Sequence, residues 1–170
     1  MQPAVESADD RQSPRRAFRF PDGFLWGAAT ASHQVEGGNR WNDWWELEQS
    51  GRLPHKSDDA CRHFELYESD FDLARSLGHN AHRFSIEWSR IEPRQGEWNQ
   101  GALDHYVAVI DALLRRGIEP VVTLHHFTNP AWFARRGGWT RGDSVGLFVR
   151  YVERVAAALA NRVRFWLTIN

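Results

Sequence analysis

The chain has 170 residues, of which 42% are hydrophobic and 25% are charged, and its formal net charge is −1 at pH 7. This length and balance are typical of one globular domain, and the near-zero charge gives no electrostatic case for binding nucleic acid or an anionic membrane surface. The single cysteine excludes an internal disulfide and leaves no cysteine pair for a zinc site.

Residues 1–17 are polar and show no hydrophobic periodicity, which predicts a disordered leader ahead of one domain over residues 18–170. The N-terminus lacks the apolar core of a signal peptide, and no run reaches the roughly 18 apolar residues of a membrane span. Together with the single cysteine, this predicts a cytoplasmic protein.

Short apolar runs at four places predict β-strands. Each run ends on a side chain that can form hydrogen bonds. The runs are residues 24–30, 81–88, 121–127 and 163–170. Segments of helical periodicity separate them, so the chain is predicted to be α/β, with parallel strands joined by right-handed crossovers. Polar groups at the carboxyl ends of parallel strands meet at one mouth, where such folds bind their ligands.

Two segments after the first predicted strand are expected at this mouth. Residues 31–38 are polar and glycine-rich, which predicts a loop, and residues 39–57 are rich in tryptophan but irregular, which predicts a structured insertion. A tryptophan ring has flat apolar faces and one N–H donor, which suits the C–H faces and hydroxyl edges of a sugar. We expect Trp88 and Trp166 to pack in the core, whereas both uses stay open for the tryptophans in loops.

Apolar side chains spaced three and four residues apart predict three helices that pack on the core. Their stripes are Phe64, Tyr67, Phe71 and Ala74; Leu103, Val107, Ile110 and Leu114; and Phe148, Val152, Val155 and Leu159. The first helix is predicted to be capped by Asp58 or Asp59 and to end at Gly78, and the second to end at Gly117.

The second predicted strand carries charge on one of its two faces. Phe84, Ile86 and Trp88 alternate with Arg83 and Glu87. An unpaired buried cation would cost several kcal/mol, so Arg83 predicts a carboxylate or another anionic group nearby. Two alternatives stay open: an internal salt bridge to Glu87 or another acid, and a role in holding a catalytic carboxylate.

The third predicted strand ends on His125 and His126, which face opposite ways because they are adjacent in a strand. Only one of them can face the mouth, and a metal bound by both is poor geometry, so no metal site is expected. A hydrogen-bonded core histidine is the alternative to a ligand contact, and it is favoured more for His125. Residues 129–142 predict a loop, and the absence of a phosphate-binding glycine motif predicts no cofactor.

Four segments together resemble glycoside hydrolase family 1, the β-glucosidase and β-galactosidase family. They are FPDGFLWGAATASHQVEG at residues 20–37, RFSIEWSRI at 83–91, TLHH at 123–126 and WLTIN at 166–170. Their order and spacing are specific, although each alone would be weak. The resemblance implies a (β/α)8 TIM barrel, of which this chain supplies about the first four βα units as a half-barrel.

The resemblance also implies roles for particular residues. Gln34 and His126 would hydrogen-bond hydroxyls of the nonreducing sugar, Asn170 would bind the sugar 2-hydroxyl, and Arg83 would orient and ionise a nucleophilic glutamate. A neutral amide and imidazole each offer donor and acceptor capacity, as hydroxyl recognition needs. The family mostly has tryptophan where this chain has Phe127, so one sugar contact is predicted to be lost or shifted.

Members of this family hydrolyse glycosides with retention of the anomeric configuration, using two glutamates about 5 Å apart. By the resemblance one glutamate follows Asn170 and the other lies on a later strand, so residues 1–170 contain neither. We therefore expect half of a retaining β-glycosidase that is inactive alone. Glu36 and Glu87 are the only substitute acids expected near the mouth.

The expected partners follow from the same resemblance. They are a β-glycoside or other sugar and a complementing C-terminal half-barrel, because the first and fourth strands would be unpaired edges. The alternative is a noncatalytic sugar-binding or interaction protein in which two half-barrels pair their open edges. No nucleic acid or membrane partner is expected.

Overall fold

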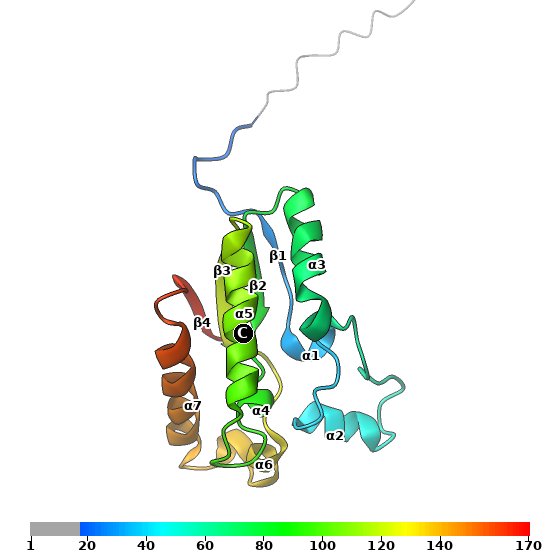
Figure 1. Ribbon diagram of the computed structural model, residues 1–170. Helices are drawn as coiled ribbons and strands as arrows, with labels where there is room; N and C mark the ends of the chain where they lie inside the picture. Colours follow the sequence, from blue (N-terminus) through cyan, green and yellow to red (C-terminus); the bar gives the residue numbers. More distant parts are fainter. Residues whose placement is uncertain (1–17) are drawn as a thin grey trace, which may run out of the picture.

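The computed structural model describes residues 18–170, and the leader predicted over residues 1–17 lies outside them. Within the described residues, four parallel strands form one sheet in the order β1-β2-β3-β4 (Figure 1). The strands are β1 Gly27–Ala29, β2 Ala81–Ser85, β3 Glu119–His125 and β4 Phe165–Ile169. The predicted α/β class and strand order are therefore confirmed.

Helices join the strands and cover one face of the sheet (Figure 1). They are α1 Ser32–Val35, α2 Asp43–Gln49, α3 His63–Ser76, α4 Trp88–Ile91, α5 Gln100–Arg115, α6 Ala131–Arg135, the 3-10 helix η1 Gly138–Thr140 and α7 Ser144–Leu159. The long helices α3, α5 and α7 lie side by side, and the short ones gather near the carboxyl ends of the strands. Among residues 18–170, no helix has the length and apolar character needed to cross a membrane.

The core fills the space between the sheet and the three long helices. Trp88, Ile110 and Tyr151 are fully buried, and the rings of Trp88 and Tyr151 stack with their centroids 5.0 Å apart. Burying each such side chain stabilises the fold by about 1.5–3 kcal/mol. The predicted packing of Trp88 is confirmed, but Leu114 is 42% exposed because the buried face of α5 runs through Leu113.

The first two strands are shorter than predicted. Asn80 explains the late start of β1, because its side-chain amide donates to the carbonyl of Phe24 and accepts from the N–H of Trp26. Those backbone groups are then unavailable for a longer ladder with β2. β2 ends at Ser85, and Trp88 is the first residue of α4 and not the last residue of a strand.

Three predicted loop or cap regions also differ. Residues 31–38 contain α1, residues 39–57 contain α2, and residues 129–142 contain α6 and η1. The predicted caps Asp58 and Asp59 lie in a segment with left-handed residues, in which Asp58, Ala60 and Arg62 have φ of 38°, 46° and 56°. α3 therefore begins only at His63.

The face of the sheet opposite the helices is largely open. β1 and β4 lie at the edges, and each pairs with a single neighbour within residues 18–170. β1 approaches β2 closely, because a Cβ on Gly27 would meet the Ala81 carbonyl oxygen at 2.0 Å. Phe165 and Ile169 on β4 are 37% and 57% exposed.

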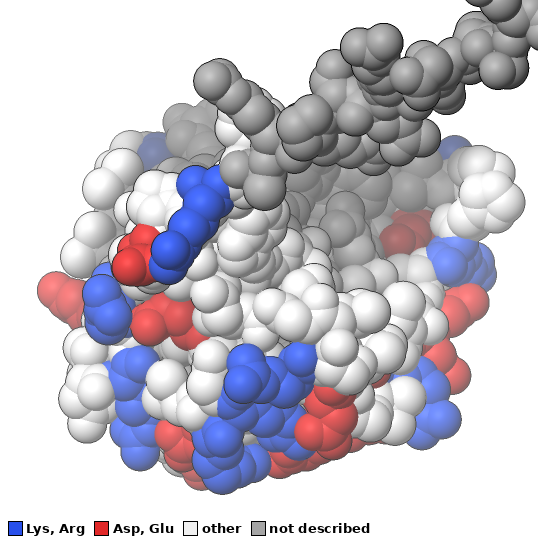
Figure 2. All heavy atoms as spheres, turned by 90° about the horizontal axis from the view of Figure 1, so that it is seen from above, with Lys and Arg blue, Asp and Glu red and all other residues white. Residues whose placement is uncertain are grey.

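Charges of both signs alternate on the face formed by the amino ends of the strands (Figure 2). Arg115 and Arg116 on α5 form ion pairs of 2.7–2.8 Å with Glu68 and Asp72 on α3. The described residues visible on this face therefore form no single-sign patch of the kind that binds nucleic acid.

Candidate functional site

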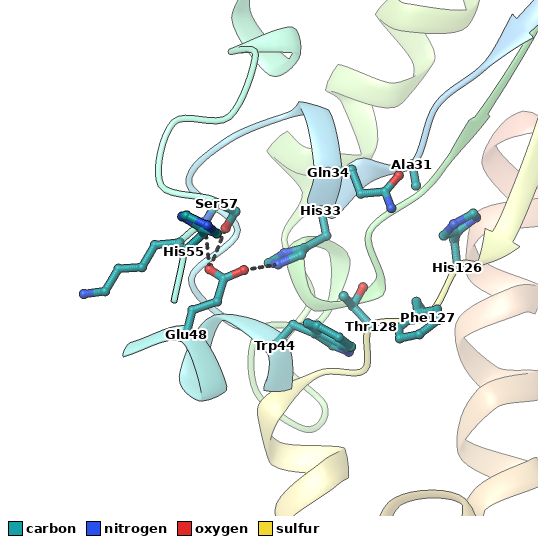
Figure 3. Close-up of a pocket in the computed structure, with 11 residues that line it drawn as sticks. Ala31, His33, Gln34, Trp44, Glu48, His55, Ser57, His126, Phe127 and Thr128 are labelled. Atoms are coloured by element: carbon teal, nitrogen blue, oxygen red, sulfur yellow. Dashed lines mark hydrogen bonds and ion pairs between the residues drawn. The ribbon is translucent and has the colours of Figure 1, made fainter. Parts of the chain in front are cut away.

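A cavity of about 400 Å³ lies near the carboxyl ends of β1 and β3 (Figure 3). Its lining residues are Ala31, His33, Gln34, Trp44, Glu48, His55, Lys56, Ser57, His126, Phe127 and Thr128. The volume is in the range of small-molecule sites, and the position is the one that parallel strands provide for a ligand. The segment at residues 39–57 lies beside this mouth, as predicted.

Three of the residues singled out in the sequence line this cavity together. Gln34 comes from α1, directly after β1, and His126 and Phe127 follow β3. Phe127 has φ of 73°, in the left-handed region that costs a nonglycine residue about 1–2 kcal/mol. The Phe127 ring meets Trp44 edge to face at 5.1 Å. The cavity thus combines an apolar aromatic pair with an amide and an imidazole.

Arg83 reaches the site through His126. Arg83 Nη1 lies 3.0 Å from His126 Nδ1 and also donates to the Thr30 carbonyl at 3.4 Å. Arg83 forms no ion pair with a carboxylate in the described part of the chain, so of the two open alternatives the internal salt bridge to Glu87 or another acid is excluded within residues 18–170. The acid expected beside this half-buried arginine is not found within residues 18–170.

Glu87 is occupied by hydroxyl groups instead. Its carboxylate is buried and accepts hydrogen bonds from Ser32 Oγ at 2.9 Å, Thr128 Oγ1 at 2.9 Å and Ser89 Oγ at 2.7 Å. Ser32 follows β1, Ser89 follows β2 and Thr128 follows β3. One buried charge therefore fixes the three segments at the mouth relative to one another.

Glu36 is likewise buried and fully bonded. It accepts from Arg90 Nε at 2.8 Å, from the Tyr106 hydroxyl at 2.8 Å and from Asn39 Nδ2 at 3.3 Å. Burial raises the pKa of Glu36, against the opposing effects of Arg90 and the Tyr106 hydrogen bond. Neither Glu36 nor Glu87 lines the cavity, so the expectation of substitute acids at the mouth is corrected.

The carboxylate that does line the cavity is Glu48, which the sequence reasoning missed. Its Oε1 lies 3.0 Å from His33 Nε2, and its Oε2 accepts from the Ser57 N–H and hydroxyl at 3.0 and 2.7 Å. Burial opposes ionisation, but the hydrogen bonds from Ser57 and His33 lower the pKa of Glu48 overall. Glu48 therefore acts as an anchor for the cavity wall.

Trp44, one of the tryptophans for which sugar contact and packing were both left open, lines the cavity. It lies four positions before Glu48 on α2, so both side chains fall on one helix face. Asn42 caps this helix by accepting from the Trp45 N–H at 2.7 Å, and its amide contacts His33 Nδ1 at 3.0 Å. The Asn42 cap was the signal in the sequence that could have predicted α2.

His125, the last residue of β3, and His126, the residue after it, face different surroundings, as predicted for adjacent residues. His125 is buried, contacts Asn129 Oδ1 at 3.1 Å and packs against Trp139, whereas His126 lines the cavity. Asn170 donates its N–H to the His125 carbonyl at 3.0 Å. Asn170 therefore lies beside the end of β3 but is not part of the cavity lining.

The chemistry that the cavity offers is hydrogen bonding next to aromatic surface. In residues 18–170, no group of three or more His, Cys, Asp or Glu side chains is placed to hold a metal ion. A parallel sheet with helices on one face only and a cavity at the carboxyl ends of its strands is the arrangement found in part of a (β/α) barrel.

The chain belongs to glycoside hydrolase family 1. The family described as "Glycosyl hydrolase family 1" matches residues 16–170, which confirms the resemblance seen in the four sequence segments.

Similar proteins are much longer than this chain. Thermostable beta-glucosidase B of Thermobispora bispora is 40% identical over 158 residues, which are 89% of this chain and 33% of that protein. Human cytosolic beta-glucosidase is 38% identical over 168 residues, with 89% and 34% covered. The beta-glycosidase from Pyrococcus horikoshii superposes with a TM-score of 0.85 at 52% identity, over 89% of this chain and 36% of that structure. The chain thus spans about a third of these relatives and matches the N-terminal part of their barrels.

Proposed function

We propose that residues 18–170 form the sugar-binding half of a retaining β-glycosidase that hydrolyses β-linked O-glycosides such as β-glucosides. The observation that carries the proposal is the convergence of Gln34, His126 and Phe127, from after two different strands, on one cavity of about 400 Å³. A Thermotoga maritima beta-glucosidase, solved in complex with castanospermine and 37% identical to this chain, supports it.

Each residue of the site has a proposed role. Gln34 and His126 hydrogen-bond hydroxyls of the nonreducing sugar, and Phe127 contacts the sugar ring. Asn170 binds the 2-hydroxyl from the end of the neighbouring strand. Arg83 orients and ionises the nucleophilic glutamate, and a half-buried arginine without an ion-pair partner in residues 18–170 supports that role.

Both catalytic glutamates are proposed to come from chain outside residues 1–170. Retaining hydrolysis needs two carboxylates about 5 Å apart, one as nucleophile and one as acid and base. The oxygens of Glu36, Glu48 and Glu87 are already occupied by internal hydrogen bonds. The 170-residue chain alone therefore gives no turnover under this proposal.

The proposed partner is a complementing C-terminal half-barrel that pairs with β1 and β4. A second candidate, self-association of two copies into a noncatalytic sugar-binding protein, is favoured by the exposure of Phe165 and Ile169 on the open face. Sedimentation of the purified chain over a range of concentrations separates the two, because only self-association produces dimers without another chain.

A cytoplasmic location is also proposed. The name of the human relative, cytosolic beta-glucosidase, and the single cysteine support it. Fractionation of producing cells tests it, and recovery of the protein outside the cytoplasm would contradict it.

Titration with methyl β-glucoside, followed by NMR, tests the sugar site. We expect saturable shifts that Gln34→Ala weakens, while the exposed Gln95→Ala, away from the cavity, leaves them unchanged. A chromogenic β-glucoside tests catalysis, and no turnover is expected. Turnover that Glu36→Gln or Glu87→Gln abolishes would contradict the assignment of the catalytic acids to chain outside residues 1–170.

A further inference from the structure

We infer that Arg83 is a positioning residue that fixes the tautomer of His126, so that His126 presents only a hydrogen-bond donor to the ligand. This inference rests on the proposed sugar-binding function of the cavity. It gives Arg83 a role that is complete within residues 18–170 and does not depend on a carboxylate from elsewhere.

The contact between the two side chains determines where the imidazole proton lies. Arg83 Nη1 and His126 Nδ1 are 3.0 Å apart. A guanidinium remains protonated and has no acceptor, so Nδ1 has to be the acceptor. A neutral imidazole that accepts at Nδ1 carries its proton on Nε2.

The Nε2 atom is the one left for a ligand. It has no hydrogen-bond partner among the described residues, and it is not one of their buried unpartnered atoms, so it is accessible at the cavity that His126 lines (Figure 3). Nδ1 of the neighbouring His125 is, by contrast, buried without a partner. Under this inference His126 offers a ligand only its donor, whereas the sequence alone left both donor and acceptor open.

The surroundings also keep His126 neutral. Burial, Arg83 on β2 and His125 on β3 lower the pKa of His126, while Glu87 opposes them. Protonation at Nδ1 would place two cationic groups in contact and remove the acceptor that Arg83 uses. A ligand group at Nε2 therefore has to be a hydrogen-bond acceptor. The exposed Gln34 amide, by contrast, can bond either a donor or an acceptor of the ligand.

Long-range 1H–15N NMR of the imidazole nitrogens tests the tautomer on the full chain without sugar. We expect the Nε2–H form for His126 in the wild type. In Arg83→Met we expect a mixture of tautomers and a raised pKa of His126. Arg83→Lys keeps a donor and should restore the Nε2–H form. His33 is an internal control, because its Nδ1 contacts Asn42 and not Arg83. An Nδ1–H form in the wild type, or an unchanged tautomer in a folded Arg83→Met, overturns the inference.

Sugar affinity then tests the consequence for binding. Loss of one aligned hydrogen bond predicts a dissociation constant for methyl β-glucoside about three- to tenfold higher in Arg83→Met, with most of the loss restored in Arg83→Lys. Unchanged affinity despite an altered tautomer overturns the positioning role. If the wild type shows the expected tautomer but binds no sugar, the sugar-binding proposal fails while the Arg83–His126 assignment stands.

Discussion

The two faces of the sheet differ in how completely they are covered. On the helix side, Ile110 is 0% exposed within a continuous core, whereas Ile169 on β4 is 57% exposed. The cavity residues Gln34, His126 and Phe127 lie at the carboxyl ends of the strands, outside this core. The difference shows that the packing which stabilises residues 18–170 is largely separate from the surfaces offered to ligand and partner.

The largest predicted effect compares the same substitution in both settings. Ile110→Ala removes a fully packed side chain and is expected to lower the free energy of unfolding by about 2–5 kcal/mol. Ile169→Ala is expected to change it by less than about 0.5 kcal/mol. Urea unfolding measures the free energy of unfolding of both variants. A large loss in Ile169→Ala would show that the open face is covered in solution, and a dependence on protein concentration would identify a second copy as the cover.

A buried histidine makes the stability of the covered side depend on pH. The ring of His82 lies 6.4 Å from that of His63, and its Nε2 contacts Thr30 Oγ1 at 3.3 Å. Burial, followed by the neighbouring His63, lowers the pKa of His82 to about 4. The folded protein therefore resists a proton that the unfolded chain accepts near pH 6.5.

The free energy of unfolding should consequently decrease as pH falls from about 6.5 to about 4, because the unfolded state takes up the proton first. His82 alone contributes a decrease of about 3 kcal/mol across this window. His82→Phe, which does not titrate, should flatten the dependence. The remaining part comes from His105, whose pKa burial lowers to about 4 as well, and from His126, whose pKa is also lowered. An equal slope in the variant and the wild type would be evidence against this assignment.

The smallest predicted effect concerns the cavity wall. Phe127 has a left-handed backbone and is 65% exposed, so Phe127→Gly should raise the free energy of unfolding by about 1 kcal/mol while weakening sugar binding. Phe127→Ala removes the ring but keeps the strain, so it should weaken binding without the gain in stability. Equal stability of the Gly and Ala variants, measured by urea unfolding, would refute a strained backbone at this position.

Hydrophobic periodicity was enough to predict the parallel strands, the three long helices and the end of the sheet at which Gln34 and His126 meet, whereas the strand order followed from the family resemblance. The details that it missed depend on contacts between residues distant in sequence. Asn80 shortens β1 through hydrogen bonds to Phe24 and Trp26, and His126 replaces the acid expected beside Arg83. No local pattern contains such pairings, whereas the Asn42 cap was a local signal that could have been used.

The hydroxyl groups gathered on Glu87 have a consequence for engineering this barrel. Ser32, Ser89 and Thr128 come from three separate connections, yet each contributes one hydrogen bond to the same carboxylate. Transplanting one connection from a homologue with an apolar residue at such a position would leave the buried anion short of a donor. Loop transplants at the carboxyl ends of β1, β2 and β3 should therefore exchange the three connections together.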